Sequence, residues 1–345
     1  MFVHRSAQTL AVLQDGAVDA LADHLAALGI ERAALIAGHS VRRTHFFQRI
    51  LQSLPASALT ALPPVPPHSS AQWVNAAVAA ARGHGIDGFV SVGGGSASDS
   101  AKACAMLLAE GGSLEQHAIR FTPPDRLVAP TLNQPKLPIV AVVGTASGAE
   151  LTPSLGVSND MGKKMIFSDP KLCCRVVLMD PQANLEVPAE LMLSTGMNAL
   201  AHAVEGLYSA TRTPITDALA LEALHGLPLA LRQVHRQPQD AHARAALLAA
   251  AHLAGLVIAN ARTCLHHAIC HAIGAYCGVP HGTLQAGIEA LQTELGVPKR
   301  LRDIGVQITQ LPAVADKTMG ERGLHFNPRK VQDASEILTL LQQAF

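Results

Sequence analysis

The chain has 345 residues, of which 49% are hydrophobic and only 15% are charged, and its formal net charge is zero at pH 7. A chain of this length and composition can bury a sizeable core in two domains or one large one. The even balance of charge excludes an overall field that would attract nucleic acid or an anionic membrane. We therefore expect a globular protein with neither of these as a partner.

The N-terminal residues and the cysteines indicate the compartment. Met1 and the residues after it form a mixed segment without an apolar signal core. The longest apolar run, residues 245–259, is too short to span a bilayer and contains His252, so we expect a buried helix there. The six cysteines show neither a CxxC pair nor a regular spacing, which is typical of reduced thiols. We therefore expect a cytoplasmic protein.

The first half of the chain alternates short apolar runs with alanine-rich helical stretches. Continuous apolar strands separated by helices predict a parallel sheet covered on both faces. The predicted strands are residues 33–37, 88–92, 137–143 and 175–179. Residues 62–67 contain four prolines, so they are predicted to form a loop or a sheet edge.

The pattern changes at Pro188, after which long helical segments follow one another without a convincing strand. The predicted helices are residues 189–210, 216–234 and 241–262. We therefore predict an α/β domain over residues 1–185 and an all-helical domain over residues 186–345. A cleft between two such domains is a common place for a ligand.

A glycine-rich turn follows the second predicted strand. Gly93, Gly94 and Gly95 precede Ser96 and open a predicted helix. Glycines allow backbone N–H groups to approach an anion closely, and the start of a helix adds the positive end of its dipole. The alternative is an ordinary tight turn between a strand and a helix. The run is not the GxGxxG fingerprint of a Rossmann site.

Histidines in the second half have informative spacing. Asn198 and His202 are four residues apart, as are His267 and His271, so a helix places each pair on one face. His281 lies further on, between a proline and a glycine. Imidazoles on neighbouring helices and a loop can converge on a divalent cation. Each histidine taken alone is more often a hydrogen-bonded core or surface residue, and we interpret His252 and His266 in this way.

Taken in order, these motifs resemble the iron-containing alcohol dehydrogenases, a superfamily that shares the dehydroquinate synthase-like fold and includes maleylacetate reductases. The motifs are GGGSxxDxAK at residues 93–102, GMxAxxHxxE at residues 196–205, and an HxxxH pair followed by Pro-His-Gly. The resemblance implies a NAD(P)-dependent oxidoreductase that moves a hydride between the nicotinamide and a small polar alcohol or carbonyl substrate. It also implies a homodimer formed through the α/β domain.

The resemblance also implies a cofactor site. Its residues would be Gly93, Gly94, Gly95, Ser96 and Asp99 of the first motif, Thr145 of the family's second cofactor loop, and Lys164 beside the nicotinamide ribose. The family's acidic residue after the first strand, which would select NAD, is missing from residues 38–43. We therefore predict that NADPH is accepted at least as well as NADH, with Arg42 or Arg43 near the 2′-phosphate.

The implied metal ligands are Asn198, His202, His267 and His281, with Fe²⁺ or Zn²⁺ as the ion. The family has an aspartate where this chain has Asn198, and a neutral amide is a poor ligand for a divalent ion. The substitution predicts weak or absent metal binding, as in maleylacetate reductases. His271 is the candidate for proton relay or polar stabilisation, with His202 and His267 as its catalytic neighbours.

Three functions stay open on this basis. The first is a metal-assisted dehydrogenase, and the second is a metal-independent maleylacetate reductase that forms 3-oxoadipate during aromatic degradation. The third is a degenerate nucleotide-binding protein without catalysis. It is favoured by the loss of the acidic ligand and by the early arrival of residues 296–305 after Leu284. Either a real deletion trims the wall of the cleft there, or a stretch of chain is missing.

Overall fold

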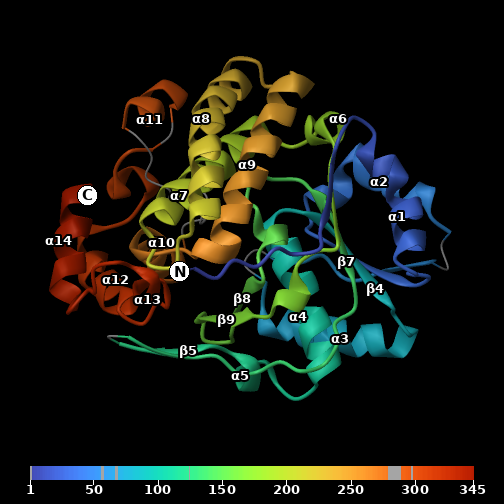
Figure 1. The fold of residues 1–345 in the computed structure, drawn as a ribbon, viewed down its shortest axis with the longest axis horizontal. Helices are drawn as coiled ribbons and strands as arrows, with labels where there is room; N and C mark the ends of the chain where they lie inside the picture. Colours follow the sequence, from blue (N-terminus) through green and yellow to red (C-terminus); the bar gives the residue numbers. More distant parts are fainter. Residues whose placement is uncertain (1, 56–57, 67–68, 124, 279–288, 297) are drawn as a thin grey trace.

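The computed structural model describes residues 2–55, 58–66, 69–123, 125–278, 289–296 and 298–345 (Figure 1). Its first half contains a parallel sheet of six strands in the order β1-β10-β7-β4-β2-β3. The strands are β1 (Leu10–Leu13), β2 (Ala33–Ala37), β3 (Leu59–Ala61), β4 (Gly88–Gly93), β7 (Ile139–Val143) and β10 (Val176–Met179). The four predicted strands and the parallel sheet are therefore confirmed.

Helices cover both faces of this sheet, as predicted. They are α1 (Leu21–Ala27), α2 (His45–Ser53), α3 (Ala71–His84) and α4 (Gly95–Glu110), and two short helices, α5 (Leu114–His117) and α6 (Pro181–Asn184), complete this half. Strand β2 shows why its sequence lacks a polar alternation. Its Ala34 and Ile36 join the core formed with α3 and α4, whereas Ala33, Leu35 and Ala37 join the core formed with α1 and α2. Both faces of the strand are buried, so every position is apolar.

Two hairpins in the first half were not predicted from the sequence. They are β5 (Arg120–Thr122) with β6 (Arg126–Val128), and β8 (Ser154–Ser158) with β9 (Lys164–Ser168). The second hairpin is fixed to α4 by Lys102, which is fully buried. Its Nζ donates to the carbonyl oxygens of Ala149 at 2.5 Å and Thr152 at 2.6 Å, just before the hairpin, and lies 3.3 Å from that of Ser154 on β8. This contact holds β8 and β9, and with them Lys164, against the start of α4.

The second half is helical, as predicted. Its helices are α7 (Ala189–Tyr208), α8 (Pro214–Arg236), α9 (Ala241–Ala261), α10 (Leu265–Cys277), α11 (Glu289–Leu295), α12 (Leu311–Thr318), α13 (Gly323–Phe326) and α14 (Ala334–Ala344). Gly196 and Gly206 let α7 approach α8 and α9 closely, because a Cβ there would lie 2.7 Å from Leu231 and 2.1 Å from Val257. The predicted domain boundary at residue 185 falls between α6 and α7; it stays a prediction.

Helix α9 is long and apolar enough to cross a membrane by length and composition alone. In the structure it packs against α7 and α8 (Figure 1). Of its most apolar stretch of 18 residues, 56% is buried. A helix in the core of a folded domain can have the same length and apolar composition. All six cysteines are free thiols.

Candidate functional site

A cleft of about 830 Å³ lies between the sheet and the helical half. One wall is formed by the segments that follow the carboxyl ends of β2, β4 and β7, and the other by residues of α7, α9 and α10. In open α/β sheets, ligands bind in the crevice outside the carboxyl ends of the strands. The cleft is therefore where the sheet would present a cofactor to the helical half.

The glycine turn brings backbone to the floor of this cleft. Gly93 has φ +129°, a conformation that favours glycine, and its carbonyl oxygen accepts the N–H of Gly144 at 2.8 Å. A Cβ on Gly94 would lie 2.8 Å from the Thr145 side chain, and one on Gly144 would lie 3.0 Å from the Gly93 backbone. Larger residues would fill the space in front of the first turn of α4. The turn is therefore shaped for an anion such as a pyrophosphate.

Thr145 supplies a second sign that this part of the cleft takes a polar ligand. Its hydroxyl is buried and has no hydrogen-bond partner in the part of the chain that the structure describes. Buried polar atoms are rarely left unpaired, because each costs about 1–3 kcal/mol. The residue lines the cleft beside the glycine turn. A nicotinamide cofactor therefore fits here, with its phosphates on the turn.

Asp99 also lines the cleft, but its carboxylate is already engaged. Oδ2 accepts the backbone N–H of Gly156 at 3.0 Å, which joins α4 to β8. Burial raises the pKa of Asp99, against the influence of Lys102 and Lys164. Its side chain thus holds the hairpin that carries Lys164, and its direct contact with a cofactor stays a prediction.

The two arginines after β2 differ in their surroundings. Arg42 donates from Nε to the carbonyl oxygen of Ala37 at 3.3 Å and lies over the ring of Phe47, with 5.9 Å between guanidinium and ring centre. Arg43 lines the cleft, as do the neighbouring His39 and Ser40. Of the two candidates for the 2′-phosphate of NADPH, the structure therefore favours Arg43.

Replacing Arg43 with alanine is expected to raise the KM for NADPH by about tenfold while changing the KM for NADH by less than about twofold. Only NADPH carries the phosphate that a guanidinium would bind. Steady-state kinetics with both cofactors checks this, and Arg82→Ala on the exposed side of α3 is the control. Equal changes for the two cofactors would contradict a role in 2′-phosphate recognition.

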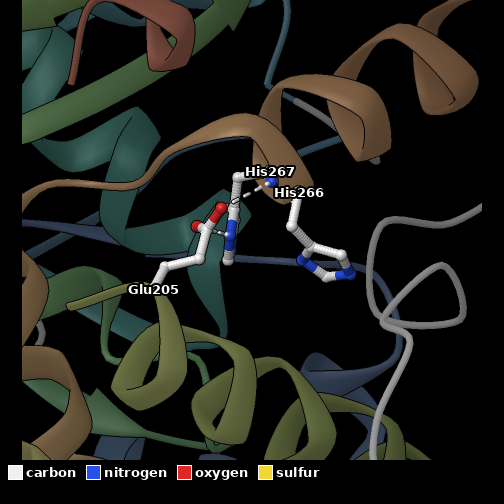
Figure 2. A group of neighbouring side chains, drawn as sticks. All are labelled: Glu205, His266 and His267. Atoms are coloured by element: carbon white, nitrogen blue, oxygen red, sulfur yellow. Dashed lines mark hydrogen bonds and ion pairs between the residues drawn. The ribbon is translucent and has the colours of Figure 1, made fainter. Parts of the chain in front are cut away.

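A chain of hydrogen-bonded side chains forms the helical wall. His267 Nδ1 lies 2.5 Å from the Glu205 carboxylate, which also accepts the backbone N–H of His267 (Figure 2). On the other side of the ring, His267 Nε2 lies 3.2 Å from Asn198 Oδ1. Asn198 Nδ2 lies 3.2 Å from His202 Nε2, and the two imidazoles stack with their centres 4.8 Å apart.

The amide of Asn198 suits this position between two rings. It accepts from His267 and donates to His202, so each Nε2 atom has a partner without a metal ion. The Glu205 carboxylate lies on the other side of the His267 ring, at Nδ1. Burial raises the pKa of Glu205, but His267 more than offsets this and brings it to about 2. The pKa of His202 falls well below its usual range because of burial and the neighbouring His267.

The group of Glu205, His266 and His267 is not spaced as one ion's ligands, whereas the Nε2 atoms of His202 and His267 each lie 3.2 Å from the Asn198 amide, a distance that ligands of one ion can have. Glu205, His266 and His267 have ligand atoms within 4.8 Å of one another. However, Glu205 and His267 are 2.5 Å apart, a hydrogen-bond distance, whereas two ligands of one tetrahedral ion are separated by about 3 Å or more. The imidazole of His266 points away from the pair (Figure 2). His281, the fourth predicted ligand, lies outside the described residues.

His271 lies one helical turn beyond His267 on α10, with their ring centres 6.3 Å apart. Its Nδ1 is 3.2 Å from Glu321 Oε2, which makes Nδ1 the donor of that hydrogen bond. Burial, and then the charge of Lys164, lower the pKa of His271. The ring lines the cleft, as Lys164 does. His271 can therefore pass a proton without being part of the Asn198 chain.

The structure brings all described residues of the predicted site into one cleft. They are Gly93, Gly94, Gly95, Ser96, Asp99, Thr145, Lys164, Asn198, His202, His267 and His271. Their individual roles stay predictions. The sequence analysis assigned no role to Glu205, Glu321 or Arg322. The place of Glu205, three residues after His202 on α7, could have indicated the first of these.

Comparisons with known proteins agree with this arrangement. A family model described as iron-containing alcohol dehydrogenase matches residues 9–181, and a C-terminal model of the same family matches residues 192–287. A maleylacetate reductase of Rhizobium sp. (strain MTP-10005) is 28% identical over 376 residues, covering 100% of this chain and 97% of the relative. A NAD-dependent methanol dehydrogenase of Bacillus methanolicus is 29% identical and covers 79% of this chain and 70% of its own.

Solved structures are also similar to this chain. A 1,3-propanediol oxidoreductase superposes with a TM-score of 0.89 at 27% identity, and the match covers 100% of both chains. The predicted fold class is therefore confirmed. The alignment with the Rhizobium relative runs over 376 positions, whereas this chain has 345 residues. The relative thus has positions that this chain lacks; that they fall after Leu284 stays a prediction.

Proposed function

Because the chain belongs to the iron-containing alcohol dehydrogenase family, we propose that it is a NAD(P)H-dependent reductase that acts on a small polar carbonyl compound without an obligatory metal ion. The observation that carries this proposal is the single cleft that contains both the glycine turn and the Asn198 chain. Hydride transfer requires a cofactor and a substrate in contact, and this cleft offers a place for each.

Each part of the cleft has a chemical task in this proposal. The turn at Gly93–Gly95, with Ser96 and Thr145, would hold the phosphates of NAD(P)H, which supplies a hydride to an electrophilic carbon of the substrate. The substrate must also gain one proton. His271 would deliver or relay it, with Glu321 fixing the ring. His202, whose Nδ1 has no hydrogen-bond partner among the described residues, would offer a hydrogen bond to the oxygen on which negative charge develops, and His267 would hold the Asn198 amide that fixes His202.

A specific observation favours one finer candidate, a maleylacetate reductase. Reduction of a carbon–carbon double bond conjugated to a ketone spreads the negative charge into an enolate. Fixed hydrogen-bond donors can stabilise such a charge, whereas a simple ketone gains more from a Lewis acid. Asn198 in place of the acidic ligand agrees with the first chemistry, and proteins with this activity are among the relatives. A metal-assisted alcohol dehydrogenase is the competing candidate.

Elemental analysis of the purified protein, combined with NADPH oxidation by maleylacetate before and after chelation, tests the proposal. We expect less than about a tenth of an equivalent of metal and undiminished turnover after chelation. Near one equivalent of iron or zinc, with chelator-sensitive activity on simple aldehydes only, would favour the alcohol dehydrogenase. Saturable NADPH binding without turnover of any carbonyl compound would favour the non-catalytic nucleotide-binding protein.

We also propose that the protein acts in the cytoplasm as a homodimer, with a small-molecule substrate and with neither nucleic acid nor a membrane as partner. The edge strand β1 supports a dimer through the α/β domain, because Leu10 and Leu13 on it are 52% and 37% exposed. Unpaired apolar edge strands readily pair with a second chain. Light scattering of the purified protein measures this state.

A further inference from the structure

Arg322 is a cation in the cleft that the steps above do not use. It lies between α12 and α13, where Gly323 packs tightly against the start of α10: a Cβ on Gly323 would lie 2.5 Å from the carbonyl oxygen of Cys264. This close approach holds Arg322 beside the helix that carries His267 and His271. The side chain is partly buried and lines the cleft.

The Arg322 guanidinium has no hydrogen-bond or ion-pair partner within the described ranges of the chain. Its neighbour Glu321 is turned towards His271, with 3.2 Å between carboxylate and ring. A guanidinium carries five N–H donors, and a partly buried one is normally paired. Arg322 therefore presents an unmatched set of donors to the space in front of the imidazoles.

Two other cations lie near Arg322 or its neighbours: Arg262, whose charge acts on Arg322, and Lys164, which lines the cleft. Burial, and then the charge of Arg262, lower the pKa of Arg322 to about 10. Arg262 has φ +65°, an uncommon conformation for a residue other than glycine, and among the described residues its guanidinium makes one long contact, 3.5 Å from the Ser154 hydroxyl. Lys164 lines the cleft near His271. The charge of Glu321 acts in the opposite direction on Arg322, but its carboxylate is paired with His271, so a further anion between the cations would be favoured.

We propose that Arg322 binds a carboxylate group of the substrate, so that the substrate is an oxo acid and not an uncharged alcohol or aldehyde. This inference rests on the proposed function and names its substrate class. The planar fork of a guanidinium matches a carboxylate with two parallel hydrogen bonds. The cofactor phosphates do not need Arg322, because the glycine turn at Gly93–Gly95 provides their cradle at the start of α4. Arg262 and Lys164 add to the positive field at the subsite.

Calorimetric titration of the protein with succinate, and with the uncharged succinamide, tests the subsite directly. The titrations are done on the free protein and on the protein saturated with NADPH. We expect succinate to bind at least about tenfold more tightly than succinamide, and Arg322→Met to weaken succinate binding by about 10- to 100-fold. Arg322→Lys keeps the charge but loses the fork, so an intermediate loss is expected. Arg302→Met, at an exposed position in the same half of the chain, is the matched control.

The outcomes separate the subsite from the proposed function. Equal binding of succinate and succinamide by the unmodified protein would overturn the carboxylate subsite, and this comparison needs no variant to fold. An unchanged succinate affinity in a folded Arg322→Met protein would overturn the role of Arg322. NADPH binding followed by cofactor fluorescence is a separate readout. If NADPH does not bind but succinate still binds more tightly than succinamide, the reductase proposal fails and the anion subsite stands.

Discussion

Replacing Asn198 with aspartate is expected to turn a metal-poor protein into one that holds close to one divalent ion per chain. The amide now donates to Nε2 of His202 and accepts from His267, at 3.2 Å in both cases. A carboxylate has no N–H, so an aspartate would conflict with a lone pair on Nε2 of His202 unless that ring moves its proton from Nδ1 to Nε2. A cation between the carboxylate and the two imidazoles removes this conflict and gains a negative ligand.

The measurement is metal content after dialysis against Zn²⁺, together with thermal unfolding before and after chelation. We expect Asn198→Asp to bind about one equivalent and to lose stability on chelation, whereas the unmodified protein keeps less than about a tenth of an equivalent and the same Tm. Asn133→Asp, at an exposed position, controls for the added charge. If Asn198→Asp stays free of metal, the amide is not what prevents binding.

The sequence predicted the fold well where elements are buried on both sides. Strand β2 reads as an unbroken apolar run because its alternate residues enter two separate cores. The edge strand β1 was not predicted, since its residues are largely exposed and one face lacks a covering layer. The hairpin of β8 and β9 was also missed. It is fixed by Lys102 on α4, a contact between residues that are about 50 positions apart in the chain.

The candidate site shows a similar division. Gly93–Gly95 follow a strand, and the pairs Asn198–His202 and His267–His271 have helical spacing, so local sequence was sufficient to select them. The partners Glu205 and Glu321 were not assigned a role, because their contacts with His267 and His271 depend on how helices from distant parts of the chain pack. The family resemblance also implied that Asn198 stands where the family has an acid. Only the structure shows that its amide lies within hydrogen-bond distance of the imidazoles of both His202 and His267.

His271 is the residue whose replacement should cost the most turnover. We expect His271→Gln to lower kcat by about 10²- to 10³-fold with maleylacetate and NADPH, because general acid–base groups contribute on this scale. Glutamine retains a hydrogen-bonding side chain but cannot relay a proton in the same way. The KM for NADPH is expected to change by less than about threefold, since the cofactor cradle lies at the glycine turn.

Glu321→Gln separates the proton relay from a purely structural effect. If the carboxylate positions His271 through Nδ1, as the 3.2 Å contact indicates, this variant should lower kcat less than His271→Gln does, by about tenfold. The double variant should then be no slower than His271→Gln alone, because the two residues act as one unit. His225→Gln, at an exposed position on α8, is the control for loss of an imidazole. A kcat for His271→Gln within about threefold of the unmodified protein would assign the proton to another donor, and additive losses in the double variant would show that Glu321 does not act through His271.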